Sequence, residues 1–243
     1  GDHRDLHLSL RRQRQMCIRD SYYAFIKNPR INSKGLDTSA ILGFTNSLFD
    51  VIKRENPDYL AVCFDKGGSQ DRLEIFSEYK ANRDETPEAI KIAVPFIEQI
   101  LKALNIPVVV KKGYEADDII GTLSKKAEQE GYQTFMVTPD KDFAQLVTEN
   151  IFMYKPMFGG GYEVWGVEEV KNKFEVTDPI QVIDFLGMKG DSADNIPGLP
   201  GVGDKTAKKF IAEYGSMEEL LACLLYTSPS PRDATLSRMP SSA

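Results

Sequence analysis

The chain of 243 residues is long enough for one large domain or two small ones. Hydrophobic residues make up 42% of it and charged residues 27%, the ordinary balance of a globular protein. No apolar run approaches the roughly 20 residues of a membrane-spanning helix, and no apolar stretch follows the basic residues near the start as in a secretory signal. We therefore expect no membrane partner.

The three cysteines, Cys17, Cys63 and Cys223, have no metal-like spacing, and any disulfide would leave one of them unpaired. A reducing, cytoplasmic compartment is the simplest interpretation. The formal net charge of −6 argues mildly against a nucleic-acid partner, because phosphate-binding proteins usually carry a basic surface. Acids that gather around divalent cations would weaken this argument, since the remaining surface could still be basic.

Both ends of the chain differ in composition from the middle. Residues 1–21 contain the basic run Arg11–Gln15 and no sustained helical or strand period. Residues 224–243 are rich in Ser, Pro and Arg, a composition typical of disorder. We expect both segments to be non-native tails that resemble translated read-through, with natural flexible tails as the alternative.

Between these ends, helical and strand patterns alternate. The predicted elements in chain order are a helix over Ser39–Arg54, a strand over Tyr59–Phe64, a helix over Pro87–Leu104 with a kink at Pro95, a strand over Ile106–Val110, a helix over Asp117–Glu130, a strand over Gln133–Thr138, a helix over Asp140–Val147, and strands over Ile151–Tyr154 and Tyr162–Trp165. Such alternation indicates a mainly parallel sheet with helices on both faces. From Val167 to about Leu221 the pattern is helical only, so we predict an α/β core over residues 22–175 and a helical subdomain over residues 176–223.

Acidic residues follow the predicted strands where the strands end, and a further group begins the helical part. In open α/β sheets, ligand sites gather at the carboxyl ends of the strands, so we expect these side chains to converge. The eight carboxylates, in four groups, are Asp65; Glu115, Asp117 and Asp118; Asp140 and Asp142; and Asp191 and Asp194.

So many neighbouring anions repel one another unless cations compensate them. Carboxylate oxygens without nearby His or Cys favour Mg²⁺ or Mn²⁺ over Zn²⁺. Two such ions about 4 Å apart activate a water and stabilise the leaving oxygen in phosphodiester hydrolysis. Taken singly, Asp117 and Asp140 would be better explained as helix caps, and Asp65 as the end of a strand.

Four motifs carry a resemblance to a known family: Phe64-Asp65, Gly113–Asp118 (GYEADD), Thr138–Asp142 (TPDKD) and Gly190–Gly198 (GDSADNIPG). Their order and spacing resemble the 5′-nuclease (flap endonuclease) family, and in particular the 5′–3′ exonuclease domain of bacterial DNA polymerase I, from about Tyr22 to Ala222. The resemblance implies a PIN-like or resolvase-like nuclease core followed by a helix–hairpin–helix subdomain. It also implies that the eight carboxylates hold two catalytic metal ions.

The stretch Ser77–Arg83, which we name the arch segment, resembles the family's arch, whose Lys and Arg contact the scissile phosphate. Lys80 and Arg83 are thereby candidate catalytic residues, and their charge suits stabilisation of a phosphate transition state. Tyr79 is a candidate DNA contact. A solvated helix face is the alternative for this stretch. Further upstream, the aromatic residues Tyr22, Tyr23 and Phe25 suit either base stacking or a core.

The glycine-rich stretch Gly198–Ala207 resembles a helix–hairpin–helix loop, in which the family holds K⁺. Glycines let the backbone approach closely, and exposed amides at the start of a helix accept phosphate. Such a loop contacts the nucleic-acid backbone, so we expect sequence-independent DNA binding. The candidate residues are Gly198, Gly201, Gly203, Lys205, Thr206, Lys208 and Lys209.

One departure from the family concerns the first strand. The family pattern begins with a strand ending in a metal-binding Asp, about ten residues before Tyr22, and we find neither here; Asp20 is too close to Tyr22 to take this role. The loss of a central strand would expose its neighbours, and the loss of one carboxylate would weaken metal binding.

The expected function is DNA hydrolysis at 5′ ends and junctions, in primer removal and excision repair. We expect the nuclease to be a monomer, and the resemblance to DNA polymerase I suggests a polymerase domain downstream in the native gene product. A catalytically defective module that binds branched DNA is the alternative, and the missing Asp favours it. A ribonuclease is a third reading, against which the glycine hairpin and the arch segment argue.

Overall fold

The computed structural model describes residues 7–13, 28–65, 68–83, 85–157 and 161–227. The helices and strands of these residues are, in chain order, β1 (His7–Gln13), α2 (Ser39–Glu55), β2 (Tyr59–Phe64), α3 (Gln70–Ile75), α4 (Glu88–Ala103), β3 (Val108–Val109), α5 (Ala116–Gln129), β4 (Gln133–Val137), the 3₁₀ helix η1 (Lys141–Leu146), β5 (Ile151–Pro156), β6 (Tyr162–Trp165), α6 (Val167–Phe174), the 3₁₀ helix η2 (Pro179–Gln181), α7 (Val182–Lys189), α8 (Asp204–Tyr214) and α9 (Met217–Thr227).

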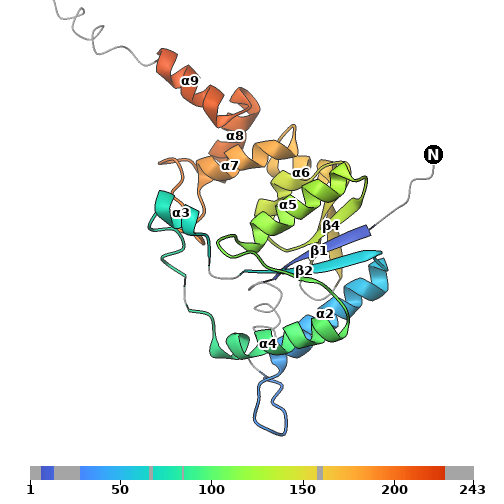
Figure 1. The fold of residues 1–243 in the computed structure, drawn as a ribbon. Helices are drawn as coiled ribbons and strands as arrows, with labels where there is room; N and C mark the ends of the chain where they lie inside the picture. Colours follow the sequence, from blue (N-terminus) through green and yellow to red (C-terminus); the bar gives the residue numbers. More distant parts are fainter. Residues whose placement is uncertain (1–6, 14–27, 66–67, 84, 158–160, 228–243) are drawn as a thin grey trace, which may run out of the picture.

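A six-stranded sheet forms the centre of the fold, in the order β3-β2-β1-β4-β5-β6 (Figure 1). Neighbouring strands from β3 to β5 are parallel, and β6 runs antiparallel to β5. The sequence of β2, YLAVCF, is almost continuously apolar, and its last four residues are buried, as a parallel strand covered on both faces requires. The prediction of a mainly parallel sheet between helices is confirmed.

Helices α2 and α4 lie side by side on one face of the sheet (Figure 1). Phe44 and Leu48 of α2 and Ile90 and Ile97 of α4 are almost completely buried against Val62 of β2. Each such side chain contributes roughly 1.5–3 kcal/mol of hydrophobic stabilisation when it is fully buried. The helical spacing of these residues therefore holds this layer on the sheet.

The opposite face of the sheet shares its core with the helical part of the chain. Met136 of β4, Trp165 of β6, Phe185 of α7 and Ile211 of α8 belong to one hydrophobic cluster. Phe174 of α6 packs edge-on against both Trp165 and Phe185, with ring centroids 6.4 and 5.4 Å apart. Packing thus holds the helical part against the sheet. The division of the chain into two domains stays a prediction.

The amino-terminal segment contradicts the expectation that residues 1–21 contain no strand. Its residues His7–Gln13 form β1, which lies between β2 and β4 at the centre of the sheet and is parallel to both. The physical reason is that backbone N–H and C=O groups of β2 and β4 need partners, and an extended segment supplies them whatever its side chains are. The expectation of a missing central strand is therefore wrong.

The sequence of β1, HLSLRRQ, nevertheless contains no acidic residue. The departure from the family thus concerns the metal-binding Asp and not the strand. Asp20, Cys17 and the aromatic residues Tyr22, Tyr23 and Phe25 lie outside the described residues. Whether residues 1–21 and 224–243 are non-native stays a prediction.

Three further elements differ from the predicted ones. The strand predicted over residues 106–110 is reduced to β3, because Pro107 has no N–H and β3 pairs with β2 alone at the edge of the sheet. The short helix after β4 is the 3₁₀ helix η1. The helix α3 escaped prediction because it buries none of its residues and so has no apolar period; Ser69 caps its first turn.

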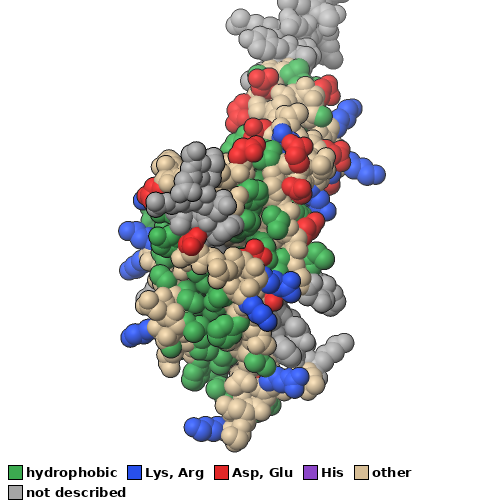
Figure 2. All heavy atoms as spheres, turned by 90° about the vertical axis from the view of Figure 1, so that its right-hand side faces the viewer, with side chains coloured by type: hydrophobic (Ala, Val, Ile, Leu, Met, Phe, Trp, Pro, Cys, Tyr) green, Lys and Arg blue, Asp and Glu red, His purple; other side chains and the backbone are tan. Residues whose placement is uncertain are grey.

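Figure 2 views the fold from the side on which the parallel strands begin. Hydrophobic side chains gather in the middle of this face, Lys and Arg lie along its margins, and acidic side chains gather in its upper part, at the height of α6 to α9 in Figure 1. Among the described residues, no helix combines the length and the apolarity that a bilayer crossing requires.

Candidate active site

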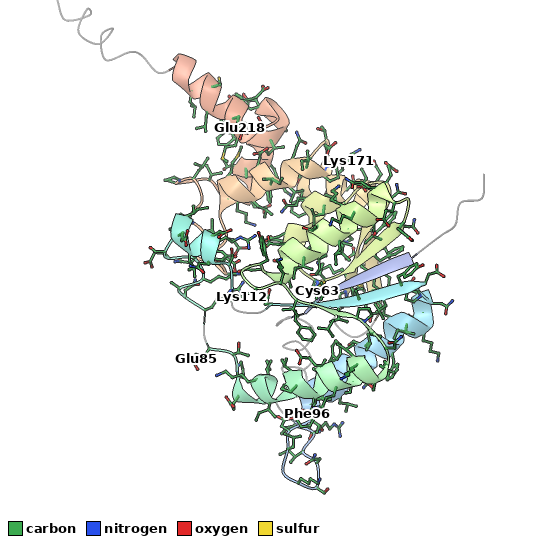
Figure 3. All side chains as sticks on the ribbon, viewed as in Figure 1. Cys63, Glu85, Phe96, Lys112, Lys171 and Glu218 are labelled. Carbon is green, nitrogen blue, oxygen red and sulfur yellow. The ribbon has the colours of Figure 1, made fainter. Side chains whose placement is uncertain are left out.

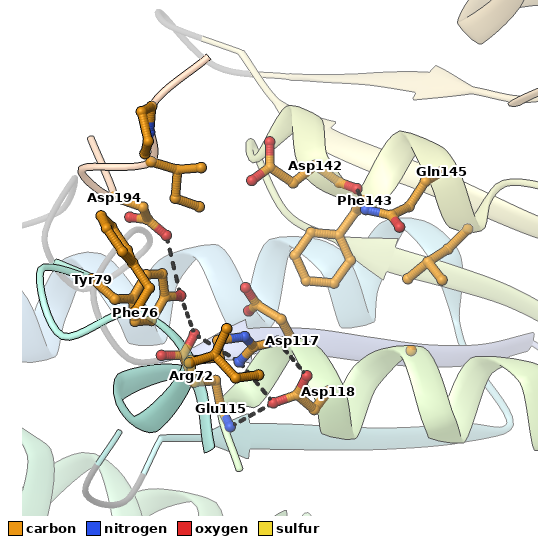
Figure 4. Close-up of a pocket in the computed structure, with 15 residues that line it drawn as sticks. Arg72, Phe76, Tyr79, Glu115, Asp117, Asp118, Asp142, Phe143, Gln145 and Asp194 are labelled. Carbon is orange, nitrogen blue, oxygen red and sulfur yellow. Dashed lines mark hydrogen bonds and ion pairs between the residues drawn. The ribbon is translucent and has the colours of Figure 1, made fainter. Parts of the chain in front are cut away.

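A pocket of about 760 Å³ opens at the carboxyl ends of the parallel strands (Figure 4). It lies between α3 and the arch segment on one side and α5 and η1 on the other. The predicted metal-site residues that line it are Glu115, Asp117, Asp118, Asp142 and Asp194. These acids come from three separate groups in the sequence. The fold brings them to one pocket, as we expect of side chains at the carboxyl ends of parallel strands.

The first turn of α5 supplies three of these carboxylates. Glu115 is the residue before the helix, and its backbone N–H donates to Asp118 Oδ2 at 2.9 Å. Negative charge is favourable at this end of a helix, because the helix dipole and the unpaired N–H groups point toward it. Glu115 is buried, and the side chain of Asp117 faces the pocket (Figure 4).

Three of the eight predicted carboxylates lie beside the pocket and do not line it. Asp65 Oδ1 accepts a hydrogen bond from the backbone N–H of Ala116, which ties the end of β2 to the start of α5. Asp140 Oδ1 accepts from the N–H of Asp142 at 3.0 Å and so caps η1. Asp191 Oδ2 accepts a hydrogen bond from Lys141 Nζ of η1 at 3.4 Å. Within the described ranges, no three acidic, His or Cys side chains are close enough together to form a ready metal cluster.

Basic side chains occupy the space between the carboxylates. Lys80 Nζ lies 2.6 Å from Glu115 Oε2 and 3.7 Å from Asp194 Oδ2, and the Arg83 guanidinium contacts Asp194. The phenol of Tyr79 donates to Glu115 at 3.2 Å, and burial, Glu115 and Asp194 raise the pKa of Tyr79. The predicted catalytic residues of the arch segment therefore meet the predicted metal-site residues.

Arg72 of α3 is a pocket residue that our sequence analysis missed. Its two terminal nitrogens donate to the two carboxylate oxygens of Asp118 at 3.1 and 2.7 Å, and Nη1 lies 3.4 Å from Glu115 Oε2. A bidentate pair of this kind fixes the direction of the carboxylate as well as its charge. The sequence signal that could have revealed Arg72 is its position only seven residues after Asp65, the acid at the end of β2.

Lys141 of η1 is a further cation that contacts predicted metal-site carboxylates. Its Nζ lies 3.4 Å from Asp191 Oδ2 and 3.7 Å from Asp142 Oδ1. Burial raises the pKa of Asp191, but the N–H of Ala193 and the ammonium of Lys141 outweigh burial and hold that pKa below its usual value. Asp191 is therefore ionised at neutral pH.

The arch segment is bound to the loop that follows α7 by hydrogen bonds in both directions. The backbone N–H of Lys80 donates to Asp194 O at 2.9 Å, and Asn195 Nδ2 donates to Glu78 O at 2.7 Å. Asn82 Nδ2 donates to Ser192 O at 2.7 Å. Lys80 itself adopts a left-handed conformation, φ 59°, which is uncommon for a residue with a Cβ and which these contacts hold in place.

The glycine hairpin places two glycines in direct backbone contact. A Cβ on Gly198 would lie 2.3 Å from the carbonyl oxygen of Lys189, and a Cβ on Gly190 would lie 2.3 Å from Gly198 N. Gly198 is therefore needed for packing between two chain segments. By contrast, Gly201 has φ +77° and an open side, and Gly203 precedes α8 with open space around it. These two glycines keep the backbone at the start of α8 accessible.

The lysines of α8 divide into two kinds. Lys208 Nζ lies 2.9 Å from Glu175 Oε1 and 3.6 Å from Asp204 Oδ2, so it joins α8 to the end of α6. Lys205 and Lys209 are exposed and form no ion pair within the part of the chain that the structure describes. Their spacing of four residues places them on one face of the helix. Thr206 lies between them and is half-buried.

The donor set around the pocket suits hard divalent cations. Every metal-site candidate supplies carboxylate oxygens, and no His or Cys lines the pocket. The carboxylates also face the side-chain cations Arg72 and Lys80, which are the kind of partners that a divalent ion would replace or supplement.

Two models of known protein families match this chain. Residues 15–175 match the family described as 5′-3′ exonuclease, N-terminal resolvase-like domain, and residues 177–238 match 5′-3′ exonuclease, C-terminal SAM fold. The chain belongs to the 5′-3′ exonuclease family. The predicted class of enzyme and the resolvase-like core followed by a helical part are thereby confirmed.

Relatives in this family include separate exonucleases and parts of polymerases. The chain is 42% identical over 201 residues to a 5′-3′ exonuclease of Aquifex aeolicus, a match that covers 82% of this chain and 68% of that protein. It is 39% identical over 206 residues to DNA polymerase I of Bacillus caldotenax, covering 84% of this chain. It spans only 23% of the length of that polymerase.

Solved structures share the fold at low identity. The T5 5′-exonuclease with bound zinc ions has a TM-score of 0.70 at 21% identity, and the match covers 95% of this chain and 83% of that one. A T5 flap endonuclease in complex with DNA and metal ions has a TM-score of 0.67 at 22% identity and the same coverage. The catalytic core of Rad2 in complex with DNA reaches 0.60 at 18% identity, covering 96% of this chain and 69% of that one.

Proposed function

We propose that this chain is a metal-dependent 5′–3′ exonuclease and flap endonuclease, which hydrolyses DNA phosphodiesters at 5′ ends and at junctions of single and double strands. The observation that carries the proposal is the pocket at the strand ends, where five carboxylates meet Arg72, Tyr79 and the cations of the arch segment. Anionic groups to hold metal ions and cationic groups to contact a phosphate are the two requirements of phosphodiester hydrolysis.

Two divalent cations, Mg²⁺ or Mn²⁺, are the proposed cofactors. When bound, they supply an activated water and stabilise the leaving oxygen. The residues that would hold them, directly or through water, are Asp65, Glu115, Asp117, Asp118, Asp140, Asp142, Asp191 and Asp194. Support comes from the all-oxygen donor set and from the metal ions in the T5 structures of the same fold.

Lys80 and Arg83 are the proposed contacts to the scissile phosphate. Both side chains already lie at the carboxylates, so a phosphate bound there comes within reach of their charge without movement of the backbone. The charge that develops on the phosphate oxygens in the transition state is stabilised by these cations. Tyr79 contributes a hydroxyl donor, since its raised pKa keeps the phenol protonated.

The glycine hairpin and α8 are the proposed duplex-binding surface. Gly201, Gly203 and Thr206 present the backbone at the start of α8, and Lys205 and Lys209 add positive charge on the same helix. A K⁺ ion in the loop is part of the proposal. Gly198 and Lys208 support this surface by packing and by the Glu175 ion pair. The contacts are to the DNA backbone, so binding is independent of sequence.

Primer removal and excision repair in the cytoplasm are the processes that this activity fits. The DNA polymerase I relatives support a polymerase domain downstream in the native gene product. We propose that the nuclease acts as a monomer.

A panel of substrates tests the proposal. The chain is incubated with Mg²⁺ and a 5′-labelled DNA flap, a nicked duplex or an RNA flap, each with an EDTA control. The proposal requires Mg²⁺-dependent products near the junction of the DNA flap. Cleavage of RNA alone would overturn it in favour of a ribonuclease.

A catalytically defective module that binds branched DNA is the second candidate, and one observation favours it. The central strand β1 carries no acidic residue, whereas the resemblance requires a metal-binding Asp at its end. This candidate requires tight, metal-independent binding of the flap substrate without products. Metal-dependent cleavage that Asp140→Ala abolishes would exclude it.

A further inference from the structure

A second groove adjoins the carboxylate pocket along the outer side of α5. It has a volume of about 670 Å³ and is lined by Lys111, Tyr114, Asp118, Thr122 and Lys126, among others. Asp118 also lines the carboxylate pocket, so the two hollows share a wall. The groove therefore begins at the proposed active site.

The groove continues to the side of the molecule where the strands begin. A third hollow of about 270 Å³ shares Leu123 and Lys126 with the groove and is also lined by Tyr59 and Tyr132. These two tyrosines pack edge-on, with ring centroids 5.7 Å apart. The three hollows thus follow α5, whose 14 residues span about 21 Å, from its first turn to its end.

The chemistry of this path is aromatic and basic. Tyr114 is 47% exposed and Tyr59 is 51% exposed, so both rings are accessible to a bound strand. Lys111 and Lys126 are exposed at the groove, and Lys112 is exposed beside Lys111 near the start of α5 (Figure 3). Exposed aromatic rings spaced among lysines are the combination that binds single-stranded nucleic acid, by stacking and by phosphate contact.

Two acidic residues line this path, Asp118 at its near end and Glu130 in the third hollow at its far end. Glu130 does not line the groove itself. Asp118 is held by the bidentate contact with Arg72, so its charge is compensated on the pocket side. The outer face of α5 presents Thr122 and Lys126 at helical spacing, while Ile120 and Ala127 are buried against the sheet.

We infer that the groove along α5, lined by Tyr114, Lys111 and Lys126, binds the single-stranded part of the DNA substrate next to the scissile junction. The inference rests on the proposed function, since it names the strand that the proposed nuclease holds beyond its pocket. The rings favour a single strand over duplex DNA, because the paired bases of a duplex stack on one another and are not free to stack on Tyr114.

Binding without cleavage tests the inference. Fluorescence anisotropy in EDTA measures the affinity of the full chain for a hairpin duplex with a 5′ oligothymidine extension and for the same hairpin with a blunt end. The Lys111→Ala/Lys126→Ala and Tyr114→Ala variants should each weaken binding of the extended hairpin by about tenfold and leave the blunt hairpin unchanged. The lysine pair should also reduce the slope of log affinity against log salt by about 1.4.

Two controls make these results specific. Lys53→Ala/Lys102→Ala removes the same charge from exposed positions on α2 and α4, on the other face of the sheet, and should leave both affinities unchanged. Tyr114→Phe keeps the ring and should restore binding of the extension. Equal losses on the extended and blunt hairpins, or losses no greater than those of the control pair, would overturn the inference.

A Mg²⁺ cleavage assay on the wild-type chain separates this inference from the proposed function. If the wild-type chain cleaves the flap and the groove variants bind DNA with unchanged affinity, the inference about the groove is refuted and the proposed function is not. Absence of cleavage together with groove-dependent binding of the extension would remove the nuclease proposal and leave the groove as a single-strand site.

Discussion

Lys80 Nζ lies 2.6 Å from Glu115 Oε2, although Lys80 belongs to the arch segment and Glu115 begins α5. Both side chains are largely buried, with 19% and 7% of their surface exposed. The Lys80 ammonium compensates the negative charge of the carboxylates. It also lies where a bound metal ion would compete with it and where a bound phosphate would be attracted to it. This contact therefore couples the arch segment to the metal site.

Replacement of Lys80 should separate metal binding from catalysis. In Lys80→Ala the carboxylates lose a competing cation, so Mn²⁺ should bind more tightly, by roughly fivefold or about 1 kcal/mol. Flap cleavage at saturating metal should nevertheless fall by about 10²–10³-fold, because a group that stabilises the transition state is gone. Calorimetric Mn²⁺ titration and single-turnover cleavage measure the two effects. Weaker Mn²⁺ binding in the variant would contradict the coupling.

Arg72 should stabilise the fold through its two hydrogen bonds to Asp118. We expect Arg72→Ala to lower the free energy of unfolding by about 1 kcal/mol, and Arg72→Lys to restore little of it, because an ammonium cannot make the parallel pair. Urea denaturation measures both. The matched control is Arg54→Ala, which removes an exposed pair with Asp50 on α2 and should leave the free energy of unfolding nearly unchanged. Equal effects at the two positions would show that the bidentate contact has no special role.

Gly198 should tolerate no side chain. A Cβ there would lie 2.3 Å from the Lys189 carbonyl oxygen, so Gly198→Ala must displace backbone, at a cost of about 3 kcal/mol or more. Gly203→Ser is the matched variant, since Gly203 has open space around it and serine is a good residue before a helix; its stability should be unchanged. Thermal melting distinguishes them. A Gly198→Ala variant as stable as Gly203→Ser would refute the close backbone contact.

The pH dependence of stability should respond to Asp184 of α7. Burial and the neighbouring Glu218 raise the pKa of Asp184 above its ordinary value, and the N–H of Met217 only partly offsets them. A carboxyl with a raised pKa in the folded state favours folding when protonated, so its stabilising effect is present at low pH and is lost as the pH rises through the folded pKa.

Asp184→Asn should therefore raise the melting temperature at pH 7 by about 1–2 °C, or up to about 0.5 kcal/mol, and should have a smaller effect at pH 3. Differential scanning calorimetry at the two pH values measures this. Glu218→Gln should give a change of the same sign, because it removes the facing charge. A melting temperature that falls at pH 7 in Asp184→Asn would contradict the assignment.

Much of the fold was predictable because the spacing of apolar residues differs between helices and buried strands. The helical stripe of Phe44 and Leu48 and the apolar run Tyr59–Phe64 appear in the structure almost as expected. Where the chemistry of the side chains did not decide the conformation, prediction failed. The strand His7–Gln13 forms because its neighbours need backbone partners, and α3 has no buried face to give it a period.

The sequence motifs located acidic residues of the pocket, but they did not show which side chains these acids contact. Glycine and acidic motifs located Glu115, Asp142 and Asp194, which line one pocket. The partners of these acids depend on tertiary contacts between segments far apart in the chain, so Arg72 escaped prediction. For Gly198 the structure adds a packing role that only the neighbouring Lys189 carbonyl reveals, and its predicted part in DNA binding stays a prediction.

The central claim is that the carboxylates of the pocket are the catalytic metal site of a nuclease. The most direct measurement is a single-turnover time course on a 5′-labelled DNA flap with Mg²⁺, comparing the wild-type chain with Asp142→Asn and with the surface control Asp50→Asn on α2. Our account predicts products near the junction from the wild type and the control, and a loss of about 10²-fold or more for Asp142→Asn without a change in folding. Cleavage by Asp142→Asn at the wild-type rate, or no cleavage by the folded wild-type chain, would contradict it.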